Sequence, residues 1–252
     1  MKKSSVIKRV VIGVVVLLVV AVAVGLTTLQ LKTYQPAELA KEALTSAGEV
    51  VVEEKSDVTI ITPKDVRETL PAVIFYQGAL VKAESYGYLA TELAKQGYSV
   101  YLLHHLLNLP ILDMKAADQV VADYQLDRFV VGGHSLGGVV ASRFAKRELG
   151  HSGLKGVFFL ASYPDEKGDL SAFEGGVLSI TASNDQVLNW SSYQASQQFL
   201  PEQTVFQSIE GGNHGGFGAY GQQAGDGQAT LSTEEQQAEV VNYLLQWLKD
   251  LK

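Results

Sequence analysis

From about Val50 onward, short apolar runs of strand length alternate with segments of helical spacing. The runs are rich in β-branched and aromatic residues and show little polar alternation, which is typical of strands buried on both faces of a sheet. The first two runs predict a hairpin. The eight expected strands are Val50–Glu53, Val58–Thr62, Ala72–Tyr76, Tyr98–His104, Arg128–Val131, Gly156–Ala161, Val177–Thr181 and Thr204–Ile209.

Helical patterns fill the intervals between the later strands, at Tyr86–Gln96, Met114–Tyr124, Leu136–Glu148 and Asn189–Phe199. A final helix opens with a capping box at Ser232 and continues to about Lys249. This alternation predicts an α/β fold, in which a mostly parallel, twisted sheet of about eight strands is flanked by helices. We expect this domain to occupy residues 50–252.

The N-terminal part of the chain has a different pattern. Residues 10–31 are 22 consecutive residues without a charge. A helix of that length reaches about 33 Å, enough to cross the hydrocarbon core of a membrane. The preceding tail, residues 1–9, holds Lys2, Lys3, Lys8 and Arg9, so we expect it to be cytoplasmic and the C-terminal domain to lie outside. Residues 32–49 are expected to form a juxtamembrane helix and linker.

A cleaved signal peptide is the alternative to this anchor. Ala21-Val22-Ala23 resembles a small-residue cleavage site. The apolar run continues past it through Leu26, which is longer than a usual signal-peptide core and favours a single-pass anchor. Cleavage near Ala23 would instead give a secreted protein.

Composition excludes several kinds of chemistry. The chain has no cysteine, so disulfides, thiolate metal sites, a cysteine nucleophile and a lipid-modified cysteine are excluded. Five of its 20 basic residues and none of its 27 acidic residues lie within positions 1–32, so the remainder is strongly acidic. An acidic body argues against a nucleic-acid partner. Nothing in the chain predicts a metal or cofactor, and its oligomeric state stays open.

The stretch from Arg128 to Ala141 carries the strongest chemical signal. It contains Gly133-His134-Ser135-Leu136-Gly137, a G-x-S-x-G pattern between an apolar strand and a helix. A sharp strand-to-helix turn lifts the serine hydroxyl clear of the sheet, and the flanking Gly133 and Gly137 leave room for that turn. Ser135 is therefore the expected nucleophile, and the N–H of Leu136 is an expected oxyanion donor. His134 is expected to pack or to line the site wall.

A serine nucleophile needs a general base, and histidine has a suitable pKa. Of the five histidines, only His214 follows the last expected strand, in a glycine-rich loop before the final helix. His151 ends the helix after Ser135, remote from the strand ends. His104 and His105 follow a strand and are expected to close it or to line the pocket. His214 is the expected base.

The acidic partner should leave the penultimate strand, and Asp185 in the stretch Val177–Asp185 fits this position. Asp165 is the second choice. A second oxyanion N–H should come from the loop after Ala72–Tyr76, where Gly78 permits a tight turn. Ala79 is the expected donor, with Leu80 as an alternative.

These residues resemble the α/β-hydrolase superfamily, in particular its small, lidless, membrane-anchored bacterial members. The resemblance covers about residues 50–250 and rests on GHSLG at 133–137, YQGAL at 76–80, SND at 183–185 and GGNHGGFGAYG at 211–221. It implies a Ser135–Asp185–His214 triad that cleaves esters or related acyl compounds without a cofactor. Many members have histidine before the oxyanion glycine, where this chain has Gln77.

The substrate itself is only bounded by the sequence. About 15 residues separate the strands ending at Ala161 and starting at Val177, too few for a cap domain, so we expect an open site for a small acyl or ester substrate. Residues 211–227 hold eight of the 24 glycines and form either a loop over the site or an irregular connection. Two further functions stay open: an acyltransferase with the same triad, and an inactive, membrane-tethered binding module.

Overall fold

The structure, a computed structural model, describes residues 2–45, 48–64 and 70–251. Residue 1 of the expected basic tail and residues 46–47 of the expected linker lie outside this range. The chain divides into two compact units, Met1–Thr33 and Tyr34–Lys252. We call the second unit the body.

The first unit is one helix, α1, which runs from Lys2 to Lys32. Within the described residues, its stretch Val11–Lys32 is long and apolar enough to cross a membrane, and none of that stretch is buried. Apolar side chains such as Leu17, which is 70% exposed, have no protein surface to cover them. An N-terminal helix with these properties fits an anchor and also fits a signal sequence.

The body is built on an eight-stranded sheet with the order β1-β2-β4-β3-β5-β6-β7-β8. The expected hairpin is present: β1 and β2 pair antiparallel, with Val50 opposite Pro63, and β2 pairs antiparallel with β4. In the order of the sheet, β4, β3, β5, β6, β7 and β8 each pair in parallel with the next strand. The strands are Val50–Glu54 (β1), Val58–Pro63 (β2), Ala72–Tyr76 (β3), Val100–Leu103 (β4), Phe129–His134 (β5), Leu154–Leu160 (β6), Gly176–Ala182 (β7) and Val205–Ile209 (β8).

Helices join the parallel strands, as the alternating pattern predicts. The last of them begins with the expected capping box, in which Ser232 and Glu235 each bond the other's backbone N–H. The α-helices of the body are Glu38–Thr45 (α2), Gly87–Lys95 (α3), Ala116–Asp123 (α4), Leu136–Arg147 (α5), Trp190–Ser196 (α6) and Thr233–Asp250 (α7). Short 3-10 helices are Ala83–Tyr86, Leu106–Asn108, Pro110–Leu112, Glu166–Gly168, Gln197–Phe199 and Gly215–Phe217.

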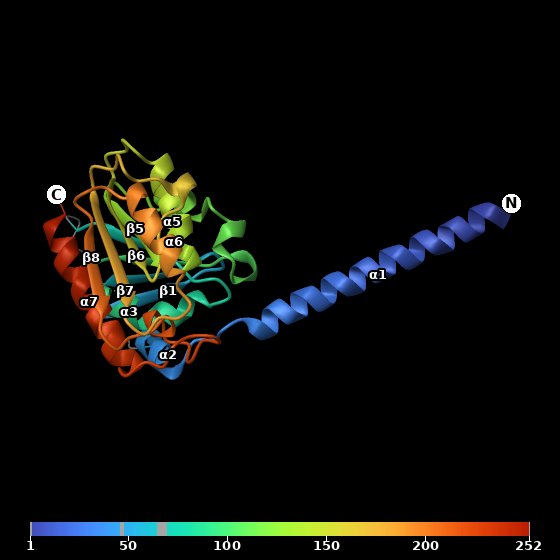
Figure 1. Cartoon of the computed structure of the whole chain (residues 1–252), viewed down its shortest axis with the longest axis horizontal. Helices are drawn as coiled ribbons and strands as arrows, with labels where there is room; N and C mark the ends of the chain where they lie inside the picture. Colours follow the sequence, from blue (N-terminus) through green and yellow to red (C-terminus); the bar gives the residue numbers. More distant parts are fainter. Residues whose placement is uncertain (1, 46–47, 65–69, 252) are drawn as a thin grey trace. The chain divides into compact units, whose positions relative to one another are not determined.

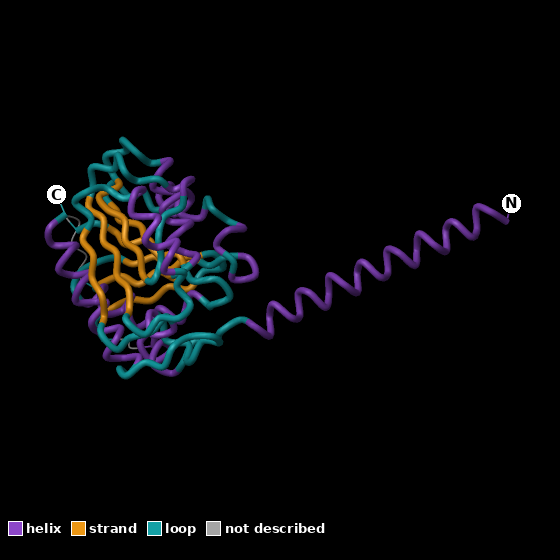
Figure 2. Tube along the Cα trace, in the orientation of Figure 1, coloured by secondary structure: helices purple, strands orange, loops and turns teal. Residues whose placement is uncertain are grey.

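Successive residues of each central strand point to opposite faces and so feed two apolar cores. On β3, Val73 and Phe75 belong to the core shared with α3 and α7, whereas Ile74 and Tyr76 belong to the core shared with α4 and α5. Figure 2 shows the strands as a central layer with helices on both sides. This arrangement confirms the predicted α/β fold.

Several element boundaries differ from the sequence prediction by one to three residues, and those of β5 and β4 lie next to the candidate site. β5 extends beyond Val131 to His134, because Gly133 pairs with Tyr76 and His134 pairs with Leu160 on the neighbouring strands. β4 is shorter than expected and ends at Leu103, and His104 then bonds the carbonyl of Asp57 instead of continuing the ladder.

The first residues of the body, which follow α1 in the chain, pack on the rest of the body. Tyr34 forms an isolated parallel bridge with Val81, and α2 contacts α3. Ala40 on α2 is fully buried. The helix α2 falls within residues 32–49, and it lies within the compact unit.

The strand order predicts a ligand-binding crevice at the carboxyl ends of the parallel strands. From β3 the chain goes to β4 on one side, and it then crosses to β5 on the other side of β3. In open α/β sheets, ligands bind at such a switch point, beyond the carboxyl ends of the strands. Here those ends carry Gln77 after β3 and Ser135 after β5.

Candidate active site

Ser135 occupies the turn between β5 and α5 in a strained backbone conformation, with φ 52° and ψ −123°. Its own N–H donates to the carbonyl of Leu160, and its carbonyl accepts from the N–H of Gly138 and from the hydroxyl of Ser162. These contacts hold a conformation that a non-glycine residue rarely adopts. The turn therefore has the strained strand-to-helix geometry that the motif predicts.

The glycines of the elbow are required by close approach of the neighbouring strand. A Cβ on Gly133 would lie 2.5 Å from the carbonyl oxygen of Tyr76. A Cβ on Gly137 would collide with the carbonyl oxygens of both Tyr76 and Gln77. The first turn of α5 can therefore sit against the end of β3, next to the loop expected to supply an oxyanion donor.

His214 and Asp185 are brought together from different strand ends. Asp185 follows β7 and His214 follows β8, and the His214 Nδ1 lies 2.8 Å from the Asp185 Oδ2. Both residues are almost fully buried, and the other oxygen of Asp185, Oδ1, accepts the N–H groups of Val187 and Leu188 at 2.8 Å each. The carboxylate is thus fixed as an acceptor that orients the imidazole.

The second ring nitrogen of His214 is available for chemistry. Within the described residues, His214 Nε2 is buried without a hydrogen-bond partner. His214 and Ser135 line the same cavity of about 250 Å³, together with Leu136. With Nδ1 held as the donor to Asp185, Nε2 is the atom that can accept a proton inside that cavity.

We call the loop after β3, residues 77–80, the oxyanion loop, and two of its backbone donors are bonded within the protein. The N–H of Gly78 donates to the Tyr86 hydroxyl at 2.9 Å, and the N–H of Leu80 donates to the carbonyl of Asn108 at 2.7 Å. Among the described residues, the N–H of Ala79 has no protein acceptor. Leu80 is therefore excluded as a donor, and Ala79 remains the candidate in this loop.

His134 joins the oxyanion loop to the catalytic histidine candidate. Its Nδ1 lies 2.8 Å from the Tyr86 hydroxyl, and its ring centroid is 4.5 Å from that of His214. Burial, followed by the nearby His214 imidazole, lowers the pKa of His134 well below its usual value. His134 is consequently neutral at neutral pH, and it packs at the site as expected. The Tyr86 link spans 48 residues, and no local pattern in the sequence indicates it.

The other titratable candidates lie outside this arrangement. Asp165 is bound by the Arg143 guanidinium; burial raises its pKa, but hydrogen bonds and charge from Arg143 outweigh this and leave it below its usual value. His104 contacts the Thr59 hydroxyl at 2.8 Å, and His151 is half exposed beside Glu148. His105 stacks on Tyr76, with neither ring nitrogen hydrogen-bonded to a described residue.

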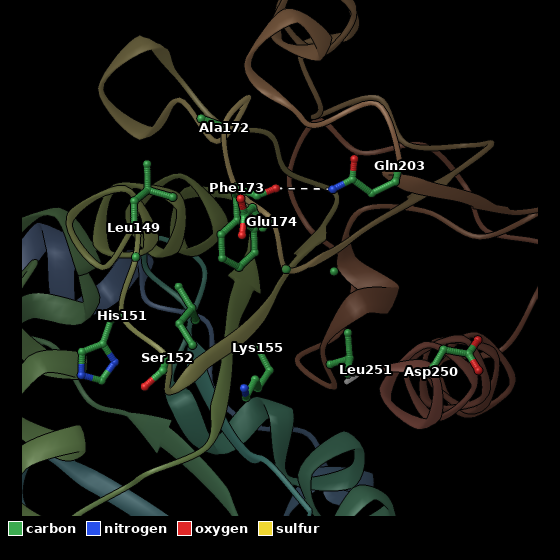
Figure 3. Close-up of a pocket in the computed structure, with 14 residues that line it drawn as sticks. Leu149, His151, Ser152, Lys155, Ala172, Phe173, Glu174, Gln203, Asp250 and Leu251 are labelled. Atoms are coloured by element: carbon green, nitrogen blue, oxygen red, sulfur yellow. Dashed lines mark hydrogen bonds between the residues drawn. The ribbon is translucent and has the colours of Figure 1, made fainter.

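A larger cavity of about 820 Å³ lies away from Ser135, Asp185 and His214, among the loop after α5, the start of β7 and the end of α7. Figure 3 shows His151, Lys155 and Asp250 around it, with one hydrogen bond, from Gln203 to the carbonyl of Phe173. Ser135, Asp185 and His214 do not line it. The smaller cavity is therefore the candidate active site, because it contains the residues that can react.

Solved structures share this fold at low sequence identity. A predicted CIB-like hydrolase from Thermoplasma acidophilum is 17% identical, with a TM-score of 0.55 over 77% of this chain and 98% of the other. An esterase from Pyrobaculum calidifontis is 18% identical, with a TM-score of 0.58 over 84% and 88%. A carboxylesterase from Bacillus subtilis is 12% identical, with a TM-score of 0.56 over 83% and 94%. At these identities the likeness establishes the fold alone.

Comparison with curated proteins finds no sequence relative. The model of one family, described as the alpha/beta hydrolase family, matches residues 72–238, which include the elbow serine, Asp185 and His214. That match spans well over half of the chain and agrees with the strand order and the elbow described above. The protein is therefore a member of the alpha/beta hydrolase family.

Proposed function

We propose that this protein is a serine hydrolase that cleaves an ester or related acyl bond through Ser135, His214 and Asp185. The observation that carries the proposal is the pairing of His214 Nδ1 with Asp185 Oδ2 at 2.8 Å, while Nε2 is unpaired in the cavity that Ser135 lines. His105 and His134 also have unpaired ring nitrogens among the described residues, but only His214 lines the cavity with Ser135 and has a carboxylate on its other nitrogen. Esterases among the structural neighbours are consistent with this reaction class.

The reaction follows from these positions. The Ser135 Oγ attacks the substrate carbonyl carbon while His214 Nε2 takes its proton, and Asp185 stabilises the resulting imidazolium. The N–H groups of Leu136 and Ala79 stabilise the tetrahedral oxyanion. His214 then protonates the departing alcohol, which leaves an acyl group on Ser135. A water molecule, activated by the same imidazole, releases the acid and restores the serine.

The cavity limits the group that can enter it. Its volume of about 250 Å³ lies below the usual range of pockets for drug-sized ligands. Val139, Val187 and Leu188 give it an apolar lining beside the polar catalytic groups. Within the described residues, the connection from β6 to β7 forms only one short 3-10 helix, so no cap domain covers the site. A short acyl group therefore fits best, with the leaving alcohol outside.

The test is the turnover of p-nitrophenyl esters of rising chain length by the wild type and by Ser135→Ala. Loss of the hydroxyl should lower kcat by about a thousandfold or more, because no other group can form the acyl-enzyme. Acetate and butyrate esters should be better substrates than long-chain ones. Retained turnover in Ser135→Ala would contradict the nucleophile, and acyl transfer to an added alcohol without free acid would favour an acyltransferase.

We also propose that residues 10–31 remain in the mature protein as a single membrane anchor, with the body on the extracytoplasmic side. The support is the length and apolar surface of α1 and the basic residues that precede the run. A mature protein whose mass corresponds to a start near Val24 would contradict the anchor.

A further inference from the structure

The chain enters the body directly beside the oxyanion loop. Tyr34 is the first residue of the body, and its N–H donates to the carbonyl of Leu80 at 2.7 Å. The Tyr34 carbonyl in turn accepts the N–H of Lys82 at 3.1 Å, which completes a parallel bridge with Val81. Leu80 follows Ala79, the free oxyanion donor, so the entry point and the candidate site share one loop.

The same residues also contact the glycine-rich loop that carries His214. The Tyr34 ring lies 5.3 Å from that of Tyr220, and its hydroxyl accepts the N–H of Ala224 at 2.9 Å. Three residues further on, the N–H of Ala37 donates to the carbonyl of Ala219 at 2.7 Å. Figure 1 shows the blue segment before α2 beside the orange-red loop. We call residues 34–37 the strap, because they connect both loops of the site.

The covalent chain limits how far the site can lie from the end of α1. Lys32, the last residue of α1, is two residues before Tyr34. Adding the bridge to Val81 and the two residues back to Ala79 gives at most about 20 Å between Lys32 and Ala79, whichever direction α1 takes. If α1 spans a bilayer, the head-group layer of that bilayer is about 5–7 Å thick and accounts for part of the distance between Lys32 and Ala79.

Exposed apolar side chains occur on the same edge of the body. Leu106 is 70% exposed and Leu112 is 53% exposed, in the segment after β4. Asn108, between them, accepts the N–H of Leu80 and the side-chain amide of Gln77. This segment is therefore bound to the oxyanion loop, and it carries two exposed leucine side chains. We call Leu106 and Leu112 the rim.

We infer that the mouth of the active site works against the bilayer surface, and that the substrate is an amphipathic ester whose scissile bond lies at head-group depth. This inference rests on the proposed hydrolase activity and on the proposed anchor. Entry through the strap keeps the site close to the membrane, and the rim supplies apolar groups for contact with it. The small cavity then takes a short acyl group, and the rest of the amphiphile stays in the bilayer.

The experiment uses the full chain in vesicles of phosphatidylcholine and phosphatidylglycerol. The lipid probe is an acetyl ester of a dialkyl-ether glycerol. Its acetyl ester bond is the only bond in the probe that an esterase can cleave. p-Nitrophenyl acetate in the same sample measures the intrinsic activity. The variant carries a 20-residue Gly/Ser insertion between Lys32 and Thr33, whose root-mean-square length of about 25 Å frees the body from the surface and leaves the strap unchanged.

We expect the wild type to release acetate from the lipid, and the insertion to lower that rate about fivefold or more while p-nitrophenyl acetate turnover stays the same. An unchanged ratio of the two rates would overturn the inference. Turnover of p-nitrophenyl acetate without release of acetate from the lipid would also overturn the inference, but it would leave the proposed hydrolase activity intact. Failure to hydrolyse either substrate would overturn the hydrolase and the inference with it.

Membrane contact of the rim has its own measurement, independent of turnover. The chain has no cysteine, so one introduced cysteine can carry a polarity-sensitive fluorophore. Leu106→Cys tests the rim. Val51→Cys is the matched control, because Val51 is 51% exposed and pairs with Thr62 near the amino end of β4, whereas Leu106 follows the carboxyl end of β4. We expect a blue shift on reconstitution into vesicles for Leu106→Cys only. Equal spectra at both positions would contradict rim contact.

Discussion

The carboxylate of Asp185 is the residue-scale feature that separates this site from a chance grouping of polar side chains. Its three hydrogen bonds, from His214 and from the N–H groups of Val187 and Leu188, occupy both oxygens. A buried carboxylate so fixed orients one imidazole nitrogen and leaves the other to act as a base. Asp165, the alternative acid, is bound to Arg143 instead.

Replacing each acid in turn tests this assignment. Asp185→Asn should lower kcat about ten-thousandfold, because an amide can hold the imidazole in the wrong tautomer. Asp165→Asn is the matched control: it breaks the pair with Arg143 and should leave kcat unchanged. Steady-state kinetics on p-nitrophenyl acetate measures both. A larger loss in the control than in Asp185→Asn would exchange the two assignments.

At the residue scale, a site residue can be predicted from the sequence only where a pattern of nearby residues or the order of the strands marks it. Ser135 lies in a five-residue motif whose geometry requires its flanking glycines, so the motif predicts it. Asp185 and His214 follow from strand order. The contact of Tyr86 with His134 and Gly78 is different, because it joins residues far apart whose types are common in apolar cores. Only packing brings these three together.

At the scale of elements, periodicity predicts the sheet and its helices because their residues face two apolar cores. The capping box at Ser232 marks the start of α7 because its two residues, Ser232 and Glu235, are close together in the sequence. The strap falls within residues 32–49, which the sequence predicts only as a juxtamembrane helix and linker. Its role comes from backbone hydrogen bonds to Leu80 and Ala219, which the identity of a side chain does not encode.

Truncation tests the strap. A chain of residues 33–252 keeps all strap contacts and should hydrolyse p-nitrophenyl acetate within about twofold of the full chain in detergent. A chain of residues 38–252 loses several backbone hydrogen bonds, each contributing about 1 kcal/mol, and should lose about tenfold or more in kcat/KM. Stopped-flow or steady-state assays compare the two proteins. Equal activity of both would show that the strap does not support the oxyanion loop.

At the scale of the whole molecule, buried neutral histidines make stability depend on pH. Burial lowers the pKa of His105 to about 4. In the unfolded chain a histidine takes up a proton near pH 6.5. Between these two values the unfolded state binds more protons than the native state, so the free energy of unfolding falls as the pH falls. Above pH 6.5 this contribution is constant.

Urea unfolding from pH 7 to pH 4 measures the effect. Between pH 7 and pH 4, His105 alone should lower the free energy of unfolding by about 3 kcal/mol. His105→Phe keeps a ring against Tyr76 and should flatten the pH dependence by about that amount, whereas His151→Asn, at an exposed position, controls for the loss of a histidine. A pH dependence in His105→Phe equal to that of the wild type would contradict the buried neutral state.

The central claim is that the Ser135 hydroxyl is activated by His214. Its most direct measurement is intact-protein mass spectrometry after incubation with a fluorophosphonate, followed by peptide mapping of the adduct. We predict one adduct per chain on Ser135, no adduct on Ser135→Ala, and labelling of His214→Ala slowed by about a thousandfold. A chain that stays unlabelled, or an adduct on another serine, would contradict the account.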